Sequence, residues 1–117
     1  MTNENGFYVA GVTFEKRQEA LKALYDEYYT VAEKKSVELI PEPENKFDAD
    51  AVQVVVVNGL TRTLIGYVPK PINIIVLEML KNNVIINIKL ADINHVPEKD
   101  IFSAKIKYDK RELKEVV

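Results

Sequence analysis

The chain has 117 residues, which is the size of one domain, since domains are typically about 100–150 residues long. Hydrophobic residues make up 47% of it and charged residues 29%, enough apolar content to bury a core and to exclude global disorder. Without cysteine and with His95 as the single histidine, it has no disulfides, thiol catalysis, cysteine-based zinc sites or multi-histidine metal sites. No glycine-rich phosphate loop is present. We therefore expect a protein that is not an enzyme and uses no cofactor.

The net charge of −2 is unevenly distributed. Residues 1–61 carry 6 Lys and Arg against 11 Asp and Glu, whereas residues 62–117 carry 10 against 7. This asymmetry can give a basic face, but it gives no strong basic stripe, so tight non-specific binding along a duplex is not expected. No signal peptide and no apolar run of about 20 residues is visible. We expect a cytoplasmic protein that does not bind a membrane.

The N-terminal part predicts a strand, a helix and a second strand. Phe7–Val12 is apolar with high β propensity, which indicates a strand. Residues 14–29 show helical periodicity, and Thr13 is the expected N-cap. Ser36–Ile40 is the second strand. Four side chains share one face of the helix: Leu21, Leu24, Tyr25 and Tyr28.

The middle of the chain predicts a loop followed by a hairpin. Pro41–Asp50 contains two prolines and several acids, which is typical of a loop. Ala51–Val57 is a nearly continuous β-branched run and predicts a buried strand. The dipeptide Asn58-Gly59 signals a hairpin turn, and Thr61–Val68 is the partner strand. Gly66 within that strand indicates a bulge or a close approach of another backbone segment.

The C-terminal part predicts a short helix and two strands. Pro71 is compatible with the first position of a helix over Ile72–Lys81. The apolar residues of this helix recur at helical spacing: Ile72, Ile75, Val76, Met79 and Leu80. Val84–Leu90 and Ile101–Tyr108 are the expected strands, and residues 91–100 are the expected polar connection between them.

Together these elements predict a mainly β fold with two helices, in the order β-α-β-β-β-α-β-β. Six short strands favour a small OB-like β-barrel, because closure removes exposed edges; an open α+β sheet is the alternative. We expect a domain over residues 7–108, a disordered tail over 1–6 and a charged tail over 109–117. The predicted core contains Val54, Val56, Ile65, Leu21, Leu24, Ile75 and Leu80.

Three segments carry a resemblance to a known family. They are Val9–Gln18 (VAGVTFEKRQ), Glu42–Val52 (EPENKFDADAV) and Ile65–Lys70 (IGYVPK). In this order they resemble the HIRAN domain, whose hallmarks are a strand entering a GxxF…RQ helix, a P-x-N-x-[YF]-D-x-x-A-[VI] loop and IGYVP[KR]. The resemblance covers most of the chain. Because no part could hold an ATPase motor, the chain looks like a stand-alone, bacterial-type HIRAN protein.

The resemblance implies capture of the free 3′ end of single-stranded DNA, in DNA repair or in the processing of stalled forks. Phe14 and Phe47 match the aromatic positions that stack on terminal bases, and Asp48 matches the carboxylate that receives the 3′-hydroxyl. Lys70 and Tyr67 match positions at the DNA backbone. The sequence departs from the family pattern at several places. Thr13 stands where DNA-binding members have arginine, phenylalanine replaces tyrosine at both stacking positions, and Tyr67 replaces histidine.

The chemistry of these residues agrees with such a role. An aromatic ring stacks on a base with about 1–3 kcal/mol, whatever the base. An ionised carboxylate such as Asp48 accepts hydrogen bonds only, so it suits a hydroxyl and repels a phosphate. Lys70 would neutralise phosphate charge, and we include Arg17 as a further residue at the site. The resemblance implies a further aromatic from the C-terminal part, which has no assigned position here. Phe102 is the one phenylalanine available there.

Each residue also has a structural interpretation. Phe14 and Phe47 would pack in the core, and Asp48 and Asp50 would form turns with their own backbone. Lys70 would be a solvated lysine, and Arg17 would pair with Glu44 or Asp48. The acids of the loop could hold Mg²⁺, but they stand without a nucleophile. His95 is expected at the surface.

Two other functions remain open from the sequence. The first is a protein-interaction module that grips a peptide in the same groove, which the acidic N-terminal half favours. The second is a small hydrolase, which the missing phosphate loop and the missing cysteine disfavour. The sequence leaves the oligomeric state open.

Overall fold

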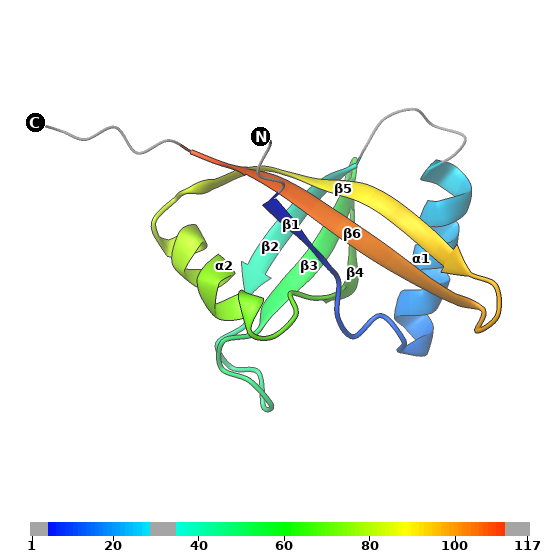
Figure 1. Ribbon diagram of the computed structural model, residues 1–117, viewed down its shortest axis with the longest axis horizontal. Helices are drawn as coiled ribbons and strands as arrows, with labels where there is room; N and C mark the ends of the chain where they lie inside the picture. The colour runs from blue at the N-terminus through cyan, green and yellow to red at the C-terminus, as the bar shows by residue number, and fades with distance from the viewer. Residues whose placement is uncertain (1–4, 29–34, 112–117) are drawn as a thin grey trace, which may run out of the picture.

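The computed structural model describes residues 5–28 and 35–111, without the side chains of Glu15, Glu27 and Tyr28. Six strands and two helices follow one another in the predicted order. The elements are β1 (Asn5–Tyr8), α1 (Glu15–Tyr28), β2 (Ser36–Pro41), β3 (Val52–Asn58), β4 (Thr61–Tyr67), α2 (Ile72–Lys81), β5 (Ile85–Val96) and β6 (Ile101–Lys110). Figure 1 shows α1 and α2 at opposite ends of the strands, with the loop between β2 and β3 projecting below them.

All six strands belong to one antiparallel sheet in the order β1-β6-β5-β2-β3-β4. The sheet is strongly curved, but no continuous ladder joins its outer strands, β1 and β4. A single bridge lies between them, in which the backbone N–H groups of Ala10 and Tyr67 each donate to the other residue's carbonyl, at 2.8 and 2.9 Å. The mainly β fold with two helices is therefore confirmed, whereas the strand ladders do not close the sheet into the predicted barrel.

Gly66 makes this bridge sterically feasible. A Cβ atom at this position would collide with the carbonyl oxygen of Ala10 and with the side chain of Val9. The register of β3 against β4 also shifts between Val54 and Val55, beside Gly66. The glycine thus combines the bulge and the close backbone approach that the sequence predicts.

The β3–β4 hairpin confirms the turn, although the turning residues differ by one position. Asn58 pairs with Thr61, so Gly59 and Leu60 form the two-residue turn. Gly59 has a φ of +62°, at the first central position, where a type II′ turn takes glycine.

Helix α1 begins one residue later than predicted. The carbonyl oxygen of Phe14 accepts hydrogen bonds from the backbone N–H groups of Arg17 and Gln18, at 2.9 and 3.0 Å. Phe14 therefore occupies the N-cap position, and the assignment of that role to Thr13 was wrong. The helix packs against β4, β5 and β6.

The core lies between the sheet and the helices and contains most of the residues predicted for it. Leu21, Leu24, Val54, Val56 and Ile65 are all buried in one cluster. Leu80 packs against this cluster and is partly buried. Tyr25 does the same from α1, whereas the side chain of Tyr28 lies outside the described residues.

The prediction for Ile75 was wrong, because its side chain is 60% exposed. Helix α2 turns Asn73 and Val76 toward the core instead, and Asn73 is only 2% exposed. Pro71 is the N-cap residue, so the helix starts after it rather than at it. The apolar spacing alone could not reveal this rotation, because hydrogen bonds of the polar Asn73 side chain fix it, as described below.

Three boundary predictions were also wrong. Residues 91–96 continue β5, because Ile93 faces the core while Asp92 and Asn94 face outward in a two-residue alternation. Asn5 and Gly6 belong to β1 and not to a tail, while β1 ends at Tyr8. Asp109 and Lys110 extend β6. Backbone pairing with a neighbouring strand, rather than side-chain hydrophobicity, defines these ends. Residues 1–4 and 112–117 of the predicted tails lie outside the described residues.

Candidate nucleic-acid interface

One groove lies where three segments meet: the turn before α1, the loop between β2 and β3, and the residues that follow β4. Its volume is about 540 Å³. Six of the seven predicted site residues line it: Phe14, Arg17, Phe47, Asp48, Tyr67 and Lys70. Thr13 is exposed and is not part of the lining, so the structure does not bring it together with the others.

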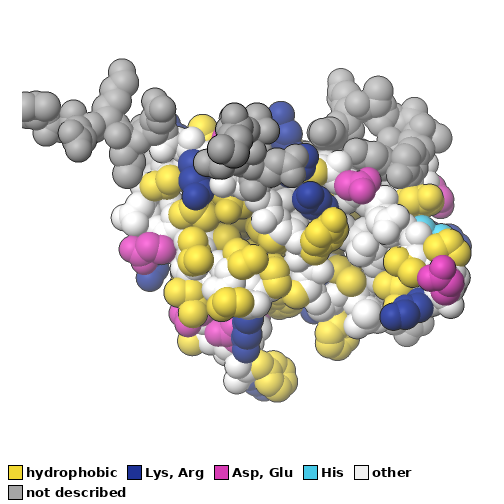
Figure 2. Space-filling model, in the orientation of Figure 1, with side chains coloured by type: hydrophobic (Ala, Val, Ile, Leu, Met, Phe, Trp, Pro, Cys, Tyr) yellow, Lys and Arg dark blue, Asp and Glu magenta, His cyan; other side chains and the backbone are white. Residues whose placement is uncertain are grey.

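The two phenylalanines of the groove project into solvent. Phe14 is 64% exposed and Phe47 is 94% exposed. Their interpretation as core residues was therefore wrong. Figure 2 shows an apolar side chain with a basic one beside it at the lower tip of the molecule, where Figure 1 draws the loop between β2 and β3. Two exposed aromatic rings beside one groove can act as platforms for flat ligands.

Arg17 extends from the first turn of α1 over the aromatic rings. Its guanidinium carbon lies 4.5 Å from the centroid of the Phe14 ring and 5.2 Å from that of Tyr67. Its Nη1 also donates a hydrogen bond to the carbonyl oxygen of Gly11, at 2.8 Å. The pairing with Glu44 or Asp48 is not formed. These contacts place a permanent positive charge in the groove and leave further N–H donors of the guanidinium for a ligand.

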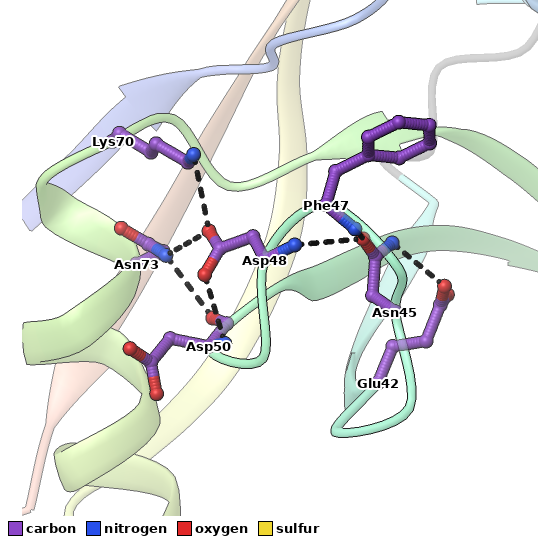
Figure 3. Close-up of polar contacts among 7 residues, drawn as sticks. All are labelled: Glu42, Asn45, Phe47, Asp48, Asp50, Lys70 and Asn73. Atoms are coloured by element: carbon purple, nitrogen blue, oxygen red, sulfur yellow. Dashed lines mark hydrogen bonds and ion pairs between the residues drawn. The ribbon is translucent and has the colours of Figure 1, made fainter.

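Asn45 shapes the loop that carries Phe47. Its Oδ1 accepts hydrogen bonds from the backbone N–H groups of Phe47 and Asp48, at 2.9 and 3.0 Å. Its Nδ2 donates to Oε1 of Glu42, at 2.9 Å (Figure 3). This arrangement is an Asx turn, which replaces regular backbone pairing in the loop. Because the turn fixes the backbone of Phe47, the ring projects outward without packing of its own.

Asp48 lines the groove and holds the loop to α2. Its Oδ1 accepts from the backbone N–H of Asp50, at 2.9 Å, and its Oδ2 accepts from Nδ2 of Asn73, at 3.0 Å. The ammonium of Lys70 lies 3.7 Å from Oδ2 (Figure 3). The role of Asp48 in the turn is thus confirmed. A carboxylate has about four lone-pair sites, so capacity for a further donor remains on a side chain that is 20% exposed.

Asn73 was missed by the sequence analysis. Its Nδ2 donates both to Asp48 and to the carbonyl oxygen of Asp50, the latter at 3.1 Å, while its Oδ1 has no hydrogen-bond partner. An asparagine among the isoleucines of α2 was the available signal. A buried polar side chain needs partners, and the acidic loop supplies acceptors for its amide.

Glu42 accepts hydrogen bonds from three side chains, among them Asn45 and Tyr67 of the groove lining. Hydrogen bonding by Asn45 is the main cause that lowers the pKa of the Glu42 carboxyl, and Gln53, Tyr67 and the charge of Arg17 add to it against the effect of burial. The Tyr67 hydroxyl donates to Oε2 at 3.1 Å. Burial, followed by this contact, raises the pKa of Tyr67. The network keeps Glu42 ionised and fixes the position of the Tyr67 ring.

Two other candidate residues lie away from the groove. Phe102 is 8% exposed and belongs to the core, so it supplies no third ring. His95 is not a plain surface residue, because its ring stacks on Phe102 at 4.5 Å and its Nε2 contacts Asp100 at 2.8 Å. Within residues 5–28 and 35–111, no group of three or more histidines and acids is placed to hold a metal ion. In the same residues, no helix is long and apolar enough to span a bilayer.

The family model of the HIRAN domain matches residues 7–107, which is most of the chain. The chain therefore belongs to the HIRAN domain family. This is a family of DNA-binding modules that are generally non-catalytic and generally recognise the 3′ end of single-stranded DNA. Comparison with curated proteins and with solved structures gives no match.

Proposed function

We propose that this chain is a non-catalytic module that captures the free 3′ end of single-stranded DNA in the groove. The observation that carries the proposal is the combination of two exposed rings, Phe14 and Phe47, with two cations, Arg17 and Lys70, around one cavity. Bases would stack on the rings, and phosphates would lie against the cations. DNA repair and the processing of stalled forks both generate such ends.

Arg17 can supply the positive charge that the chain lacks at Thr13. Where DNA-binding relatives have arginine, Thr13 brings no charge, but Arg17 extends a guanidinium over Phe14 one turn later. A guanidinium that lies over aromatic rings can still donate its other N–H groups to phosphate oxygens. We infer that Arg17 supplies the phosphate contact on this side of the groove.

Asp48 would receive the terminal hydroxyl. Its oxygens already accept from Asp50 and Asn73, so their position is fixed before DNA binds. A 3′-hydroxyl would donate to the remaining lone pairs, whereas a 3′-phosphate would bring negative charge against the carboxylate. The groove would thus distinguish the two ends by charge.

The test compares strands with a 3′-hydroxyl and a 3′-phosphate by fluorescence anisotropy. Wild type should prefer the hydroxyl end. Asp48→Ala should weaken binding of the hydroxyl end by about 1.5–3 kcal/mol and should not weaken binding of the phosphate end, which gains from the loss of the repelling carboxylate. Phe47→Ala should weaken both ends alike, because stacking does not depend on the end group.

Asn73→Ala is the matched control for Asp48→Ala. Both variants release the loop from α2, but only Asp48→Ala removes the carboxylate. Thermal melts establish that each variant is folded. Equal binding of both ends by wild type, or the same loss of end preference in Asn73→Ala as in Asp48→Ala, would refute the role of Asp48. Equal binding of both ends by wild type would also favour the alternative function, binding of a peptide in the same groove, over capture of a DNA end.

A further inference from the structure

Strand β1 continues the wall of the groove onto the outer surface of the sheet. Phe7 and Val9 are buried, whereas Tyr8 is 63% exposed and Ala10 lines the groove. Side chains two residues apart along an extended segment share one face and lie about 7 Å apart. Tyr8 therefore faces the same side as Ala10, one step farther from the groove.

Lysines of β6 lie beside Tyr8 on the same face. In the register of β1 and β6, Tyr8 is opposite Lys105 and Gly6 is opposite Lys107. Both lysines alternate with the buried residues of β6, so they point outward. The ammonium of Lys105 lies 5.5 Å from the centroid of the Tyr8 ring. Figure 2 shows basic side chains on this face, where Figure 1 draws β5 and β6.

The next strand adds a like charge to this row. Lys89 of β5 is the register partner of Lys107, and Asp92 is the partner of Lys105. Among these register partners three lysines stand against one acid, Asp92, so this part of the sheet surface carries a net positive charge that suits an anionic ligand.

A shallow hollow lies between the ring and the lysines. Its volume is about 220 Å³, and Gly6 leaves its floor open because it has no side chain. Gly6 also approaches the carbonyl of Ile106 so closely that a Cβ atom there would collide with it. Tyr8, Lys105 and Lys107 form the rim.

We propose that this outer β1–β6 surface, formed by Tyr8, Lys89, Lys105 and Lys107, binds the nucleotides that precede the captured 3′ end. The proposal rests on the proposed function, because the groove fixes where the strand begins. A base would stack on the ring of Tyr8, and the lysines would neutralise successive phosphates. Charge complementarity and the continuity of β1 with the groove both favour single-stranded DNA as the occupant.

DNA strands of two lengths distinguish binding to this outer surface from binding to the groove. We compare a dinucleotide, followed by NMR chemical shifts, with a strand of about ten nucleotides, followed by anisotropy, both with a free 3′-hydroxyl. Tyr8→Ala should weaken binding of the long strand about tenfold and leave the dinucleotide unchanged. Tyr8→Phe should behave like wild type. Leu60→Ala, at an exposed apolar residue of the β3–β4 turn, should change neither.

The lysines are tested by the salt dependence of the long strand. Lys105→Gln with Lys107→Gln should reduce the slope of log K against log salt by about 1.4, since each neutralised phosphate of a single strand contributes about 0.7. Lys81→Gln with Lys99→Gln removes the same charge from elsewhere and should reduce it much less. An unchanged slope in the first pair would overturn the proposal.

The remaining outcomes distinguish the surface from the groove. Equal losses for the dinucleotide and the long strand in Tyr8→Ala would overturn the outer surface, as would no loss for either. If long strands with free and blocked 3′ ends bind wild type equally and both depend on Tyr8, the outer surface holds and end capture by the groove fails.

Discussion

The two aromatic walls of the groove are built in different ways. Phe14 stands at the start of a helix that packs on the sheet. The side chain of Gln18 joins that helix to β6 through two hydrogen bonds and to the turn before the helix through a third. Its Nε2 donates to the carbonyls of Val12 and Phe102, at 2.6 and 2.9 Å, and its Oε1 accepts from the N–H of Phe102, at 2.8 Å. The Phe14 wall thus shares the stability of the core.

The Phe47 wall has no such support. The loop contacts α2 through Asn73. Otherwise its backbone is held by polar side chains, chiefly Asn45 and Asp48, and its residues are largely exposed. Hydrogen bonds among half-exposed groups contribute little net stability, since water competes for each partner. The comparison indicates that one ring is fixed by global folding and the other by a local network. A substitution in the Phe14 wall should therefore destabilise the whole domain, whereas one in the Phe47 wall should affect the loop alone.

The largest expected effect comes from Gln18→Ala, which breaks the Phe14 wall. Three part-buried backbone groups lose their partner, and the free energy of unfolding should fall by about 2–3 kcal/mol. Hydrogen exchange should rise across α1 and β6, and denaturant titration gives the stability. Glu19→Ala, the exposed neighbour, is the control. Faster exchange confined to the turn before α1 would show that this wall is not coupled to the core.

A smaller and local effect is expected for Asn45→Ala on the Phe47 wall. The backbone N–H groups of Phe47 and Asp48 lose their acceptor, which should cost about 1 kcal/mol because water replaces part of it. Hydrogen exchange should increase in residues 42–51 and remain unchanged in α1. Asn45→Asp retains the acceptor but places a second carboxylate beside Glu42, so it should restore slow exchange at these two groups in part. A loss of stability as large as that of Gln18→Ala would remove the distinction between the walls.

The same contrast explains what the sequence could reveal. Apolar periodicity predicted α1, the β3–β4 hairpin and five of the seven proposed core residues, because burial of apolar surface fixes those elements. It failed for Ile75 and for β5 beyond Leu90. In the first case a polar side chain, Asn73, decides which face of α2 is buried. In the second, polar residues on an exposed strand face resemble a loop.

The groove shows a similar division. Motif resemblance identified five residues that the fold brings together from segments far apart in the sequence, and Arg17, predicted beside them, lies in the same groove. The residues that hold them, Gln18, Asn45 and Asn73, were given no role, although Gln18 and Asn45 stand inside the motif segments. The contacts of Gln18 with β6 and of Asn73 with the loop join groups far apart in the sequence, which no local pattern encodes. The turn that Asn45 forms is local, and an asparagine in a polar loop was its signal.

The smallest expected effect concerns Glu42, whose network underlies both walls through Tyr67 and Asn45. Its folded pKa lies below its usual value of 4.5, so the ionised form is favoured in the folded state. The stabilisation is therefore fully present above pH 4.5 and is lost as the pH falls through the folded pKa. Glu42→Gln should be less stable than wild type at neutral pH, and the difference should shrink toward low pH.

At alkaline pH the stability depends on pH in the opposite direction, through Tyr67. The pKa of Tyr67 is raised above 10.0, so its protonated form stabilises the fold below that pH and the stabilisation disappears as the pH rises through the folded pKa. Tyr67→Phe should remove this alkaline dependence while keeping the ring beside Arg17. Denaturant titrations of both variants across pH measure the two effects. A difference between Glu42→Gln and wild type that stays constant from acid to neutral pH would show that its carboxylate charge does not stabilise the groove.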